Sequence, residues 1–229
     1  MNVARLAVAL VALTASLGAR AGVVIEGISE EKPQRIVMDG QKLRVDSDGS
    51  HAVVFDGATK RSLQLDLKGK TYTEITKEDM AALQAMMKQA GAAAPPKPAA
   101  PKFEKTGKSE QVLGKRCDLY RVVESSGTPG DEMCIAPFGT FGVERADLAG
   151  FRALGDFASE MTGGDGFEKS WADVPGLPLA SWEVEGGERR ETFRATKVEK
   201  RSVPASEFAA PAGFKKNPGF ADQMKQLGR

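Results

Sequence analysis

Two cysteines are the residues whose type and spacing point most directly to chemistry. Cys117 and Cys134 are the only cysteines in the chain, and the midpoint between them falls between Ser125 and Ser126. A hairpin that turns at this midpoint would place the two cysteines directly opposite each other. We expect a structural disulfide, which would contribute about 3 kcal/mol by restricting the unfolded chain. A reactive or metal-binding pair is the alternative, but the chain has no C-x-x-C motif.

Two further segments resemble ligand-binding loops, but each lacks an essential glycine. Residues 106–109 (T-G-K-S) resemble the end of a phosphate-binding loop, whose first glycine is replaced here by Lys102. Residues 46–50 (D-S-D-G-S) resemble the start of a calcium loop, and His51 stands where that loop needs glycine. The sequence favours a tight turn at residues 46–50 and predicts neither a nucleotide site nor a calcium site.

The remaining titratable groups form no catalytic constellation. The single histidine, His51, has no evident nucleophile beside it and cannot build a multi-histidine metal site, so we expect a surface histidine on a strand. The pairs Glu30-Glu31 and Asp131-Glu132 lie in turn-like sequence and are interpreted as surface charge. A hydrolase that uses only carboxylates stays open, but the prediction is that the protein is not an enzyme and needs no metal or cofactor.

The first twenty-one residues have the features of a secretory signal peptide. A short basic start (residues 1–5) precedes an apolar run at residues 6–17, and Ala19-Arg20-Ala21 supplies an A-x-A cleavage site. The run is shorter than the roughly 20 apolar residues that a membrane-spanning helix needs. The mature protein should therefore begin at Gly22, be periplasmic or secreted, and meet an oxidising compartment that favours the disulfide. No cysteine stands directly after the apolar run, where a lipid would be attached, so we expect a soluble protein without a lipid anchor.

Composition limits the partners that the mature chain can have. Removing residues 1–21 from the 229 leaves 208, enough for one domain. Since the removed segment carries Arg5 and Arg20 and no acidic residue, the 32 basic residues fall to 30, against 31 acidic ones. This balance gives no electrostatic reason to expect nucleic acid or an anionic membrane surface as a partner. No second long apolar segment is present, so we expect no integral membrane segment in the mature chain.

Short strands joined by tight turns fill most of the chain. Asp39-Gly40 is a strong hairpin signal, and similar turns follow at short intervals. Connections this short predict an antiparallel sheet, because parallel strands need crossovers of about a dozen residues. The expected strands are residues 23–28, 35–38, 42–46, 51–55, 63–67, 71–75, 109–113, 116–123, 131–136, 179–185 and 188–198.

Two segments have helical spacing. Residues 77–89 follow Thr76, which with Asp79 makes a variant of the capping box, and residues 145–161 carry an apolar stripe. The first helix is expected to pack on the sheet, or alternatively to form an adaptable methionine-rich lid. Residues 90–101, rich in alanine and proline, are expected to form an exposed inserted loop. We place one domain at residues 22–215, describe the chain from Pro204 as tail-like, and place a C-terminal tail at residues 216–229 with a short helix at 218–227.

These elements predict a mainly β (α+β) fold. A long antiparallel sheet curls, and its concave face has to be filled. We therefore expect a curved antiparallel sheet or open barrel of about ten strands, wrapped on two amphipathic helices.

Several segments together resemble a known family. They are K-L-R-V-D at residues 42–46, the hairpin of residues 65–74, G-K-R-C-D-L-Y-R-V at 114–122, and F-A-A-P-A-G-F at 208–214. Their order resembles the exported bacterial family known as domain of unknown function 4412, over most of the mature chain. The ending is also similar to periplasmic carriers of outer-membrane lipoproteins, which have an open barrel with helices as a lid over an apolar cavity. Those carriers place a helix before the first strand, whereas strand-like residues follow Gly22 at once.

The resemblance implies a binding or carrier module for an apolar ligand, either a lipid or an acylated protein. The candidate lining residues are Met80, Leu83, Met87, Phe151, Leu154 and Trp182. The alternative is a structural or protein-interaction domain of the cell envelope with a filled core and no ligand. In that case the alanine- and proline-rich loop and the tail would be contact segments.

Overall fold

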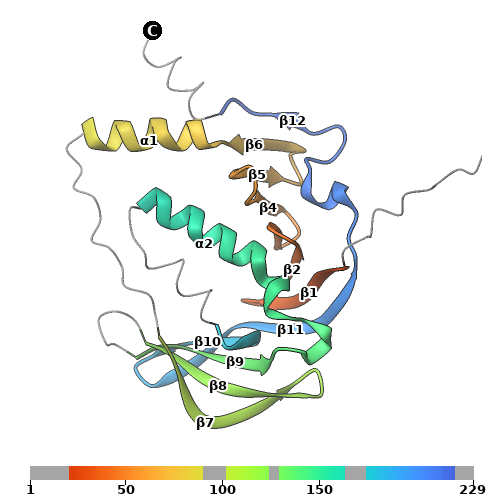
Figure 1. Ribbon diagram of the computed structural model, residues 1–229, viewed down its shortest axis with the longest axis vertical. Helices are drawn as coiled ribbons and strands as arrows, with labels where there is room; N and C mark the ends of the chain where they lie inside the picture. Colours follow the sequence, from red (N-terminus) through yellow and green to blue (C-terminus); the bar gives the residue numbers. More distant parts are fainter. Residues whose placement is uncertain (1–20, 90–101, 124–128, 163–173, 220–229) are drawn as a thin grey trace, which may run out of the picture.

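The computed structural model describes residues 21–89, 102–123, 129–162 and 174–219 (Figure 1). Within this part, one twelve-stranded sheet has the strand order β12-β6-β5-β4-β3-β2-β1-β11-β10-β9-β8-β7. The expected signal peptide up to residue 20 and the loop at 90–101 lie outside the described residues, as does most of the helix expected at 218–227.

The strands of the sheet fall into two arms that meet where β1 pairs with β11. The first arm contains β1 (Ala21–Ser29), β2 (Lys32–Asp39), β3 (Lys42–Ser47), β4 (His51–Asp56), β5 (Arg61–Asp66), β6 (Thr71–Ile75) and β12 (Lys215–Lys216). The second arm contains β7 (Lys102–Val112), β8 (Lys115–Val123), β9 (Pro129–Pro137), β10 (Gly176–Glu185) and β11 (Glu188–Ser202).

The mainly β, antiparallel fold class is confirmed. The sheet is curved and unclosed, in agreement with the expected curved sheet or open barrel, since it ends at β12 on one side and at β7 on the other. It has twelve strands rather than about ten, because β12 was not predicted; this two-residue strand pairs in parallel with β6. Strand β7 also begins at Lys102, seven residues before the expected start at residue 109.

The tight turns have the backbone that their sequences predict. Gly40 has a φ of +58°, and the β2–β3 hairpin closes with Asp39 opposite Lys42. Glu30 and Glu31 join β1 to β2 with φ values of +48° and +66°, the left-handed pair that a two-residue hairpin of type I′ needs. These short connections keep consecutive strands antiparallel and in register.

Helix α2 (Ala149–Thr162) occupies the concavity of the sheet (Figure 1). It continues from the 3-10 turn η2 (Arg145–Leu148), which the sequence assigned to the same helix, and which follows a second 3-10 turn, η1 (Thr140–Gly142). The helix comes very close to the sheet at Gly150, where an added Cβ would lie 2.6 Å from the carbonyl oxygen of Lys42. Further along, the ring centroids of Phe157 and Phe55 are 5.2 Å apart.

Helix α1 (Lys77–Gln89) has the predicted bounds and follows β6 directly. Its first turn is capped as the sequence indicates. The Thr76 backbone N–H donates to the Asp79 carboxylate at 3.0 Å, and the Asp79 N–H donates to the Thr76 hydroxyl at 3.2 Å. These bonds satisfy N–H groups at the start of the helix that have no partner inside it.

The sheet has apolar residues on both faces, because side chains alternate along each strand. We call the cluster beneath α2 the concave core. It includes Val23, Ile25, Met38, Leu43, Phe55, Leu148 and Phe157. We call the cluster on the opposite face the convex cluster. It contains Val24, Val37, Ala52, Val54, Leu63, Leu65, Val203 and Phe208.

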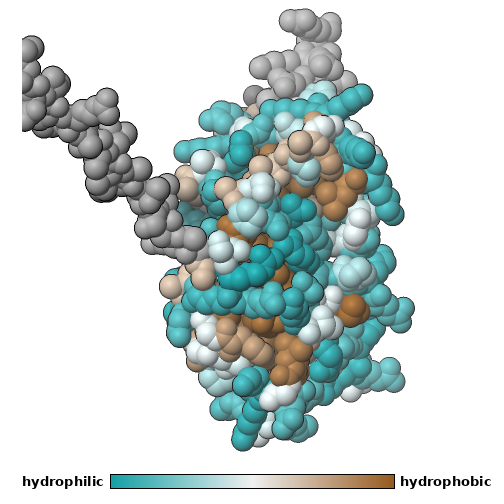
Figure 2. Space-filling view, turned by 90° about the vertical axis from the view of Figure 1, so that its right-hand side faces the viewer, coloured by the Kyte–Doolittle hydropathy of each residue, from teal (hydrophilic) through white to brown (hydrophobic). Residues whose placement is uncertain are grey.

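The segment from Pro204 onward is part of the fold and covers the convex cluster. We call residues 204–217 the strap, which includes the 3-10 turn η3 (Ala205–Phe208) and β12. Phe208 is buried in the convex cluster and Phe214 packs against it. The backbone N–H of Asn217 donates to the carbonyl of Tyr72 at 2.7 Å, so hydrogen bonding to β6 extends two residues past the expected domain end at 215. On the side that carries the strap, Figure 2 shows small apolar patches separated by hydrophilic surface.

Candidate functional site

Three of the predicted lining residues lie half-buried on the helices at the concave core. Met80 comes from α1, and Phe151 and Leu154 come from α2; all three pack against the core. Leu83 and Met87 belong to α1, but their side chains are outside the described residues. The helical spacing in the sequence therefore places the described helix residues at one core.

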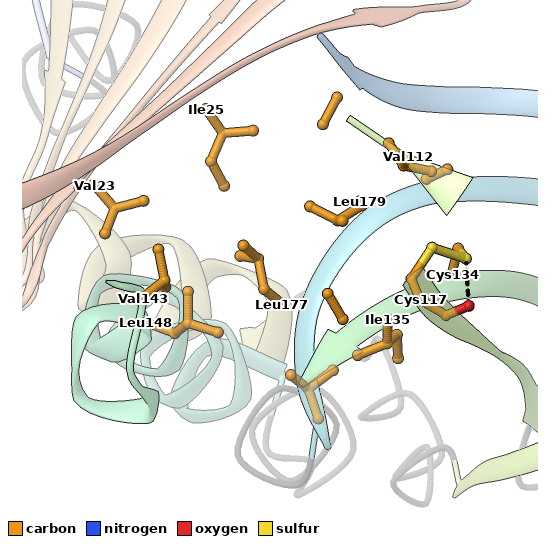
Figure 3. Close-up of a cluster of buried hydrophobic side chains, with 14 of the residues drawn as sticks. Val23, Ile25, Val112, Cys117, Cys134, Ile135, Val143, Leu148, Leu177 and Leu179 are labelled. Atoms are coloured by element: carbon orange, nitrogen blue, oxygen red, sulfur yellow. Dashed lines mark hydrogen bonds between the residues drawn. A yellow bond between two sulfur atoms is a disulfide. The ribbon is translucent and has the colours of Figure 1, made fainter. Parts of the chain in front are cut away.

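The concave core itself is assembled from both arms of the sheet. Figure 3 shows side chains of β1, of β10 and of the segment leading into α2 pointing toward one another. Around this packed centre, half-buried apolar side chains from β2, β3, α1 and α2 contact the core without being sealed from solvent. We call Ile36, Val45, Met80, Phe151 and Leu154 the apolar rim. Such a surface can bury an apolar ligand, since each methylene removed from water contributes about 0.8 kcal/mol.

Trp182, the remaining predicted lining residue, belongs to the concave core but is covered by two arginines. Its side chain is only 6% exposed. The guanidinium carbon of Arg189 lies 4.2 Å from the ring centroid and that of Arg194 lies 5.6 Å from it. Arg189 is also held by Glu132 at 3.0 Å and by Glu110 at 3.2 Å. This cation–π cover occupies the ring surface that a ligand would use, so we do not include Trp182 in the site.

The sequence did not indicate that Arg189 and Arg194 would cover Trp182. Arg189 and Arg194 lie on β11, whereas Glu110 comes from β7, 79 residues earlier than Arg189. Alternation along β11 shows which residues share a face, but the approach of β7 depends on how strongly the second arm curls.

The predicted disulfide is present between Cys117 and Cys134, with both cysteines fully buried and their Cα atoms 5.2 Å apart. The expectation that the two cysteines face each other directly is wrong. The β8–β9 register pairs Cys134 with Leu119 and Asp118 with Ile135, so the bridge joins positions offset by two residues. The offset is set by the regular register of residues 118–121, and the ladder has a further irregularity between Arg121 and Val123.

Asp48, Ser50 and His51 lie close together at the β3–β4 turn, but their hydrogen bonds are not those of a catalytic triad. The Asp48 carboxylate accepts hydrogen bonds from the backbone N–H of Ser50, at 3.0 Å, and from the Ser50 hydroxyl. These bonds lower the pKa of Asp48 to about 2. In a catalytic triad the carboxylate holds the histidine and the serine is accessible, whereas Ser50 is only 6% exposed here. The cluster is a turn motif, and His51 is an exposed strand residue as predicted.

The side chains of the two segments that resemble ligand-binding loops, residues 106–109 and 46–50, make structural contacts within the protein. Residues 106–109 lie within β7 rather than between a strand and a helix, and the Thr106 hydroxyl donates to the carbonyl of Leu119 at 2.9 Å. The Asp46 carboxylate is bound by Arg44 at 2.6 Å and by Arg35 at 3.3 Å. Among the described residues, no group of three His, Cys, Asp or Glu side chains is arranged to hold a metal ion.

One pair of carboxylates differs from the prediction. Glu30-Glu31 forms a turn, as expected. Asp131-Glu132 lies on β9, inside the strand expected at residues 131–136, and not in a turn. Glu132 there pairs with Arg189 and Arg121, so it is an internal charge of the second arm rather than a free acid.

A model of the family described as domain of unknown function (DUF4412) matches residues 25–214. The chain belongs to the DUF4412 family. The matched range covers the described sheet apart from the start of β1 and all of β12, and it includes the strap up to Phe214, so both arms and most of the strap are parts of the DUF4412 fold. A comparison with curated proteins finds no match to this DUF4412 chain.

Solved structures similar to this DUF4412 chain include an uncharacterized conserved protein from Thermus thermophilus. It is 8% identical with a TM-score of 0.46, and the match covers 87% of this chain and 90% of that one. Two structures of PNGF-II, in the C2 and P21 space groups, are 11% and 10% identical, each with a TM-score of 0.41. They match 91% and 92% of this chain, which spans only 32% and 34% of theirs.

Within the described ranges, neither α1 nor α2 is both long and apolar enough to cross a membrane.

Proposed function

We propose that this DUF4412 protein is an exported binding module whose concave face takes an apolar ligand, such as a lipid chain or the acyl group of an acylated protein. The observation that carries the proposal is the apolar rim, where side chains from two helices and two strands stay half-buried around one core. Because the sheet is not closed between β12 and β7, a ligand can approach the helices without breaking a strand pair. The role proposed is binding rather than catalysis.

A direct test uses the mature chain from residue 22, freed of lipid and incubated with membrane lipid extract and with dodecanoate as a defined probe. Native mass spectrometry should show bound lipid, and titration should give a saturable dissociation constant for dodecanoate. Leu154→Gln should weaken dodecanoate binding at least about five-fold, since a polar group would replace an apolar contact worth about 1 kcal/mol or more. Asp156→Asn, at an exposed position two residues further along α2, is the matched control. Absence of bound lipid and of saturable binding would overturn the proposal.

The export part of the proposal has its own test. Cells producing the full chain should contain a form that begins at Gly22 in the periplasmic or secreted fraction, because residues 1–21 have the charge, length and cleavage site of a signal peptide. Terminal sequencing of that fraction measures the cleavage point. A chain that keeps Met1 and stays in the cytoplasm would refute export.

One observation favours the second candidate function, a structural or interaction domain with a filled core. Helix α2 already occupies the middle of the concavity, where Leu148 and Phe157 are buried and Phe157 contacts Phe55. In that case the protein would bind no lipid, and a chain lacking residues 90–101 would lose at least one envelope partner in a pull-down. Retention of every partner would count against this version.

A further inference from the structure

We infer that the concave face also carries a polar binding site for an uncharged, hydroxyl-rich group, such as the sugar or glycerol head of an amphiphile. The inference rests on the proposed function, because it names the kind of head group that would accompany the apolar chain. We call the site the polar ledge. It is an open pocket of about 350 Å³, and its polar side chains are those of His51, Gln64, Asp66, Thr71, Thr73 and Asn217.

The strand register shows that the polar ledge and the apolar concavity share one face. Phe55, which contacts α2, lies on the concave face, so Val53 and His51 lie on the same face of β4. Val53 pairs with Gln64, and Gln64 pairs with Thr73. His51 pairs with Asp66, and Asp66 with Thr71, in a parallel row. The two rows give a ledge about 10 Å across three strands and about 7 Å along them, the scale of one sugar ring.

The ledge adjoins the apolar rim through a pair of valines. Val45, a member of the rim, is the cross-strand partner of Val53, which also lines the ledge. Val53 is 40% exposed, a large fraction for an apolar strand residue on the face that holds the core. One ligand can therefore place its chain along the rim and its head on the ledge.

Several ledge groups are held in place while their hydrogen-bonding capacity remains available. One oxygen of Asp66 accepts the backbone N–H groups of Lys68, at 3.1 Å, and Gly69, at 2.8 Å, which orients the carboxylate. The Asn217 amide donates to the Thr73 hydroxyl at 3.4 Å. In the part of the chain that the structure describes, no hydrogen bond occupies the amide of Gln64. Amides and hydroxyls both donate and accept, which matches the hydroxyl groups of a polyol.

The charge of the ledge argues against an anionic head group. No lysine or arginine is among the residues that line the pocket, and Asp66 contributes a negative charge. Phosphate and carboxylate groups are normally recognised by cationic side chains. An uncharged polyol satisfies the amides, hydroxyls and carboxylate without an unfavourable charge interaction.

Four probes separate the ledge from the apolar site in the mature protein: octyl glucoside, methyl glucoside, dodecanoate and octylphosphocholine, each titrated by calorimetry at monomeric concentrations. Octyl glucoside should bind more tightly than octylphosphocholine, which has a chain of the same length. Gln64→Leu should weaken octyl glucoside at least about five-fold, as expected for one lost hydrogen bond of about 1 kcal/mol, and leave dodecanoate unchanged. Thr73→Val, which keeps the side-chain shape, is the second variant. Gln111→Leu, at an exposed position on β7, is the control.

Each outcome bears on the ledge. Loss of glucoside affinity in both ledge variants, with dodecanoate unaffected, supports it. Equal binding of methyl and octyl glucoside, with loss in Gln64→Leu, supports the ledge as a site for free sugars and contradicts the apolar function. Dodecanoate binding with no response of octyl glucoside to either variant overturns the ledge while the apolar function stands. Absence of binding by all four probes overturns both.

Discussion

Arg35 on β2 donates two hydrogen bonds to the carboxylate of Glu207 on η3, at 2.8 and 3.0 Å, across 172 residues of sequence. Arg35 also reaches Asp46 at 3.3 Å, and Arg44 donates to the backbone carbonyl of Glu207 at 3.1 Å. The two arginines therefore bind the strap to the sheet next to Phe208, which is buried in the convex cluster. A bidentate arginine–carboxylate pair such as Arg35–Glu207 is stronger and more directional than an ordinary surface ion pair.

Glu207→Gln should lower the free energy of unfolding by about 1 kcal/mol, because it weakens a partly buried ion pair but leaves Arg35 paired with Asp46. Hydrogen bonding to Arg35 holds the pKa of Glu207 below its ordinary value of 4.5. A lowered pKa gives stability that is present above the ordinary value and lost as pH falls through the folded-state value. The difference between the wild type and the variant should therefore shrink in urea denaturation below about pH 4.5. Glu104→Gln, at an exposed position on β7, is the control, and a difference that stays constant from pH 7 to pH 3 would contradict the prediction.

Local signals in the sequence predicted the parts of the fold that are decided within a few residues. The bonds between Thr76 and Asp79 fix the start of α1, and Asp39-Gly40 fixes the β2–β3 turn. The strap could not be predicted in this way. Its phenylalanines, Phe208 and Phe214, are separated by alanine, proline and glycine, and they find an apolar partner only after the first arm of the sheet has formed.

The same limit applies to the candidate site. Helical spacing identified Met80, Phe151 and Leu154 as residues of one core, because the period of a helix determines which residues share a face. It could not show that Arg189 covers Trp182, since that contact depends on the curvature of the second arm. The polar ledge was also missed, because its residues are ordinary strand residues until the register aligns them.

Removing the disulfide should cost about 3 kcal/mol, because Cys117 and Cys134 close a loop with a sequence separation of 17 in the unfolded chain. The double variant Cys117→Ala/Cys134→Ala should melt about 6–12 °C below the wild type in calorimetry. A reducing agent should lower the wild-type melting temperature by a similar amount and leave the double variant unchanged. A melting temperature that is insensitive to reduction in both proteins would show that the bridge contributes no stability.

Truncation of Phe157 should destabilise the packing of α2 on the sheet more than truncation of an exposed residue of the same helix. The ring is 8% exposed and its centroid is 5.2 Å from that of Phe55. Phe157→Ala should lower the free energy of unfolding by about 3–5 kcal/mol, since it creates a cavity in the concave core. Asp156→Ala changes the adjacent, exposed position and should fall within about 0.5 kcal/mol of the wild type. Equal losses in the two variants would mean that α2 contributes little to the core.

Gly27 is the place where β1 leaves no room for a side chain. A Cβ there would lie 2.5 Å from the Phe193 ring and 2.6 Å from the carbonyl oxygen of Arg194, at the point where the β1–β11 ladder is irregular. The ring can shift slightly, but the carbonyl belongs to the neighbouring strand and is held by the sheet. Gly27→Ala should therefore lower the free energy of unfolding by about 1–3 kcal/mol, as for other overpacked core positions.

The control for Gly27 is a glycine with room for a methyl group. At Gly219 an added Cβ would meet the Asp79 carboxylate at 3.5 Å, an ordinary contact distance. Gly219→Ala should be neutral or slightly stabilising, because it reduces the freedom of the unfolded chain without a clash. Both variants are compared with the wild type by urea denaturation. If Gly27→Ala were as stable as Gly219→Ala, the junction between the two arms would have to be more adaptable than the close approach of Phe193 and Arg194 to β1 implies.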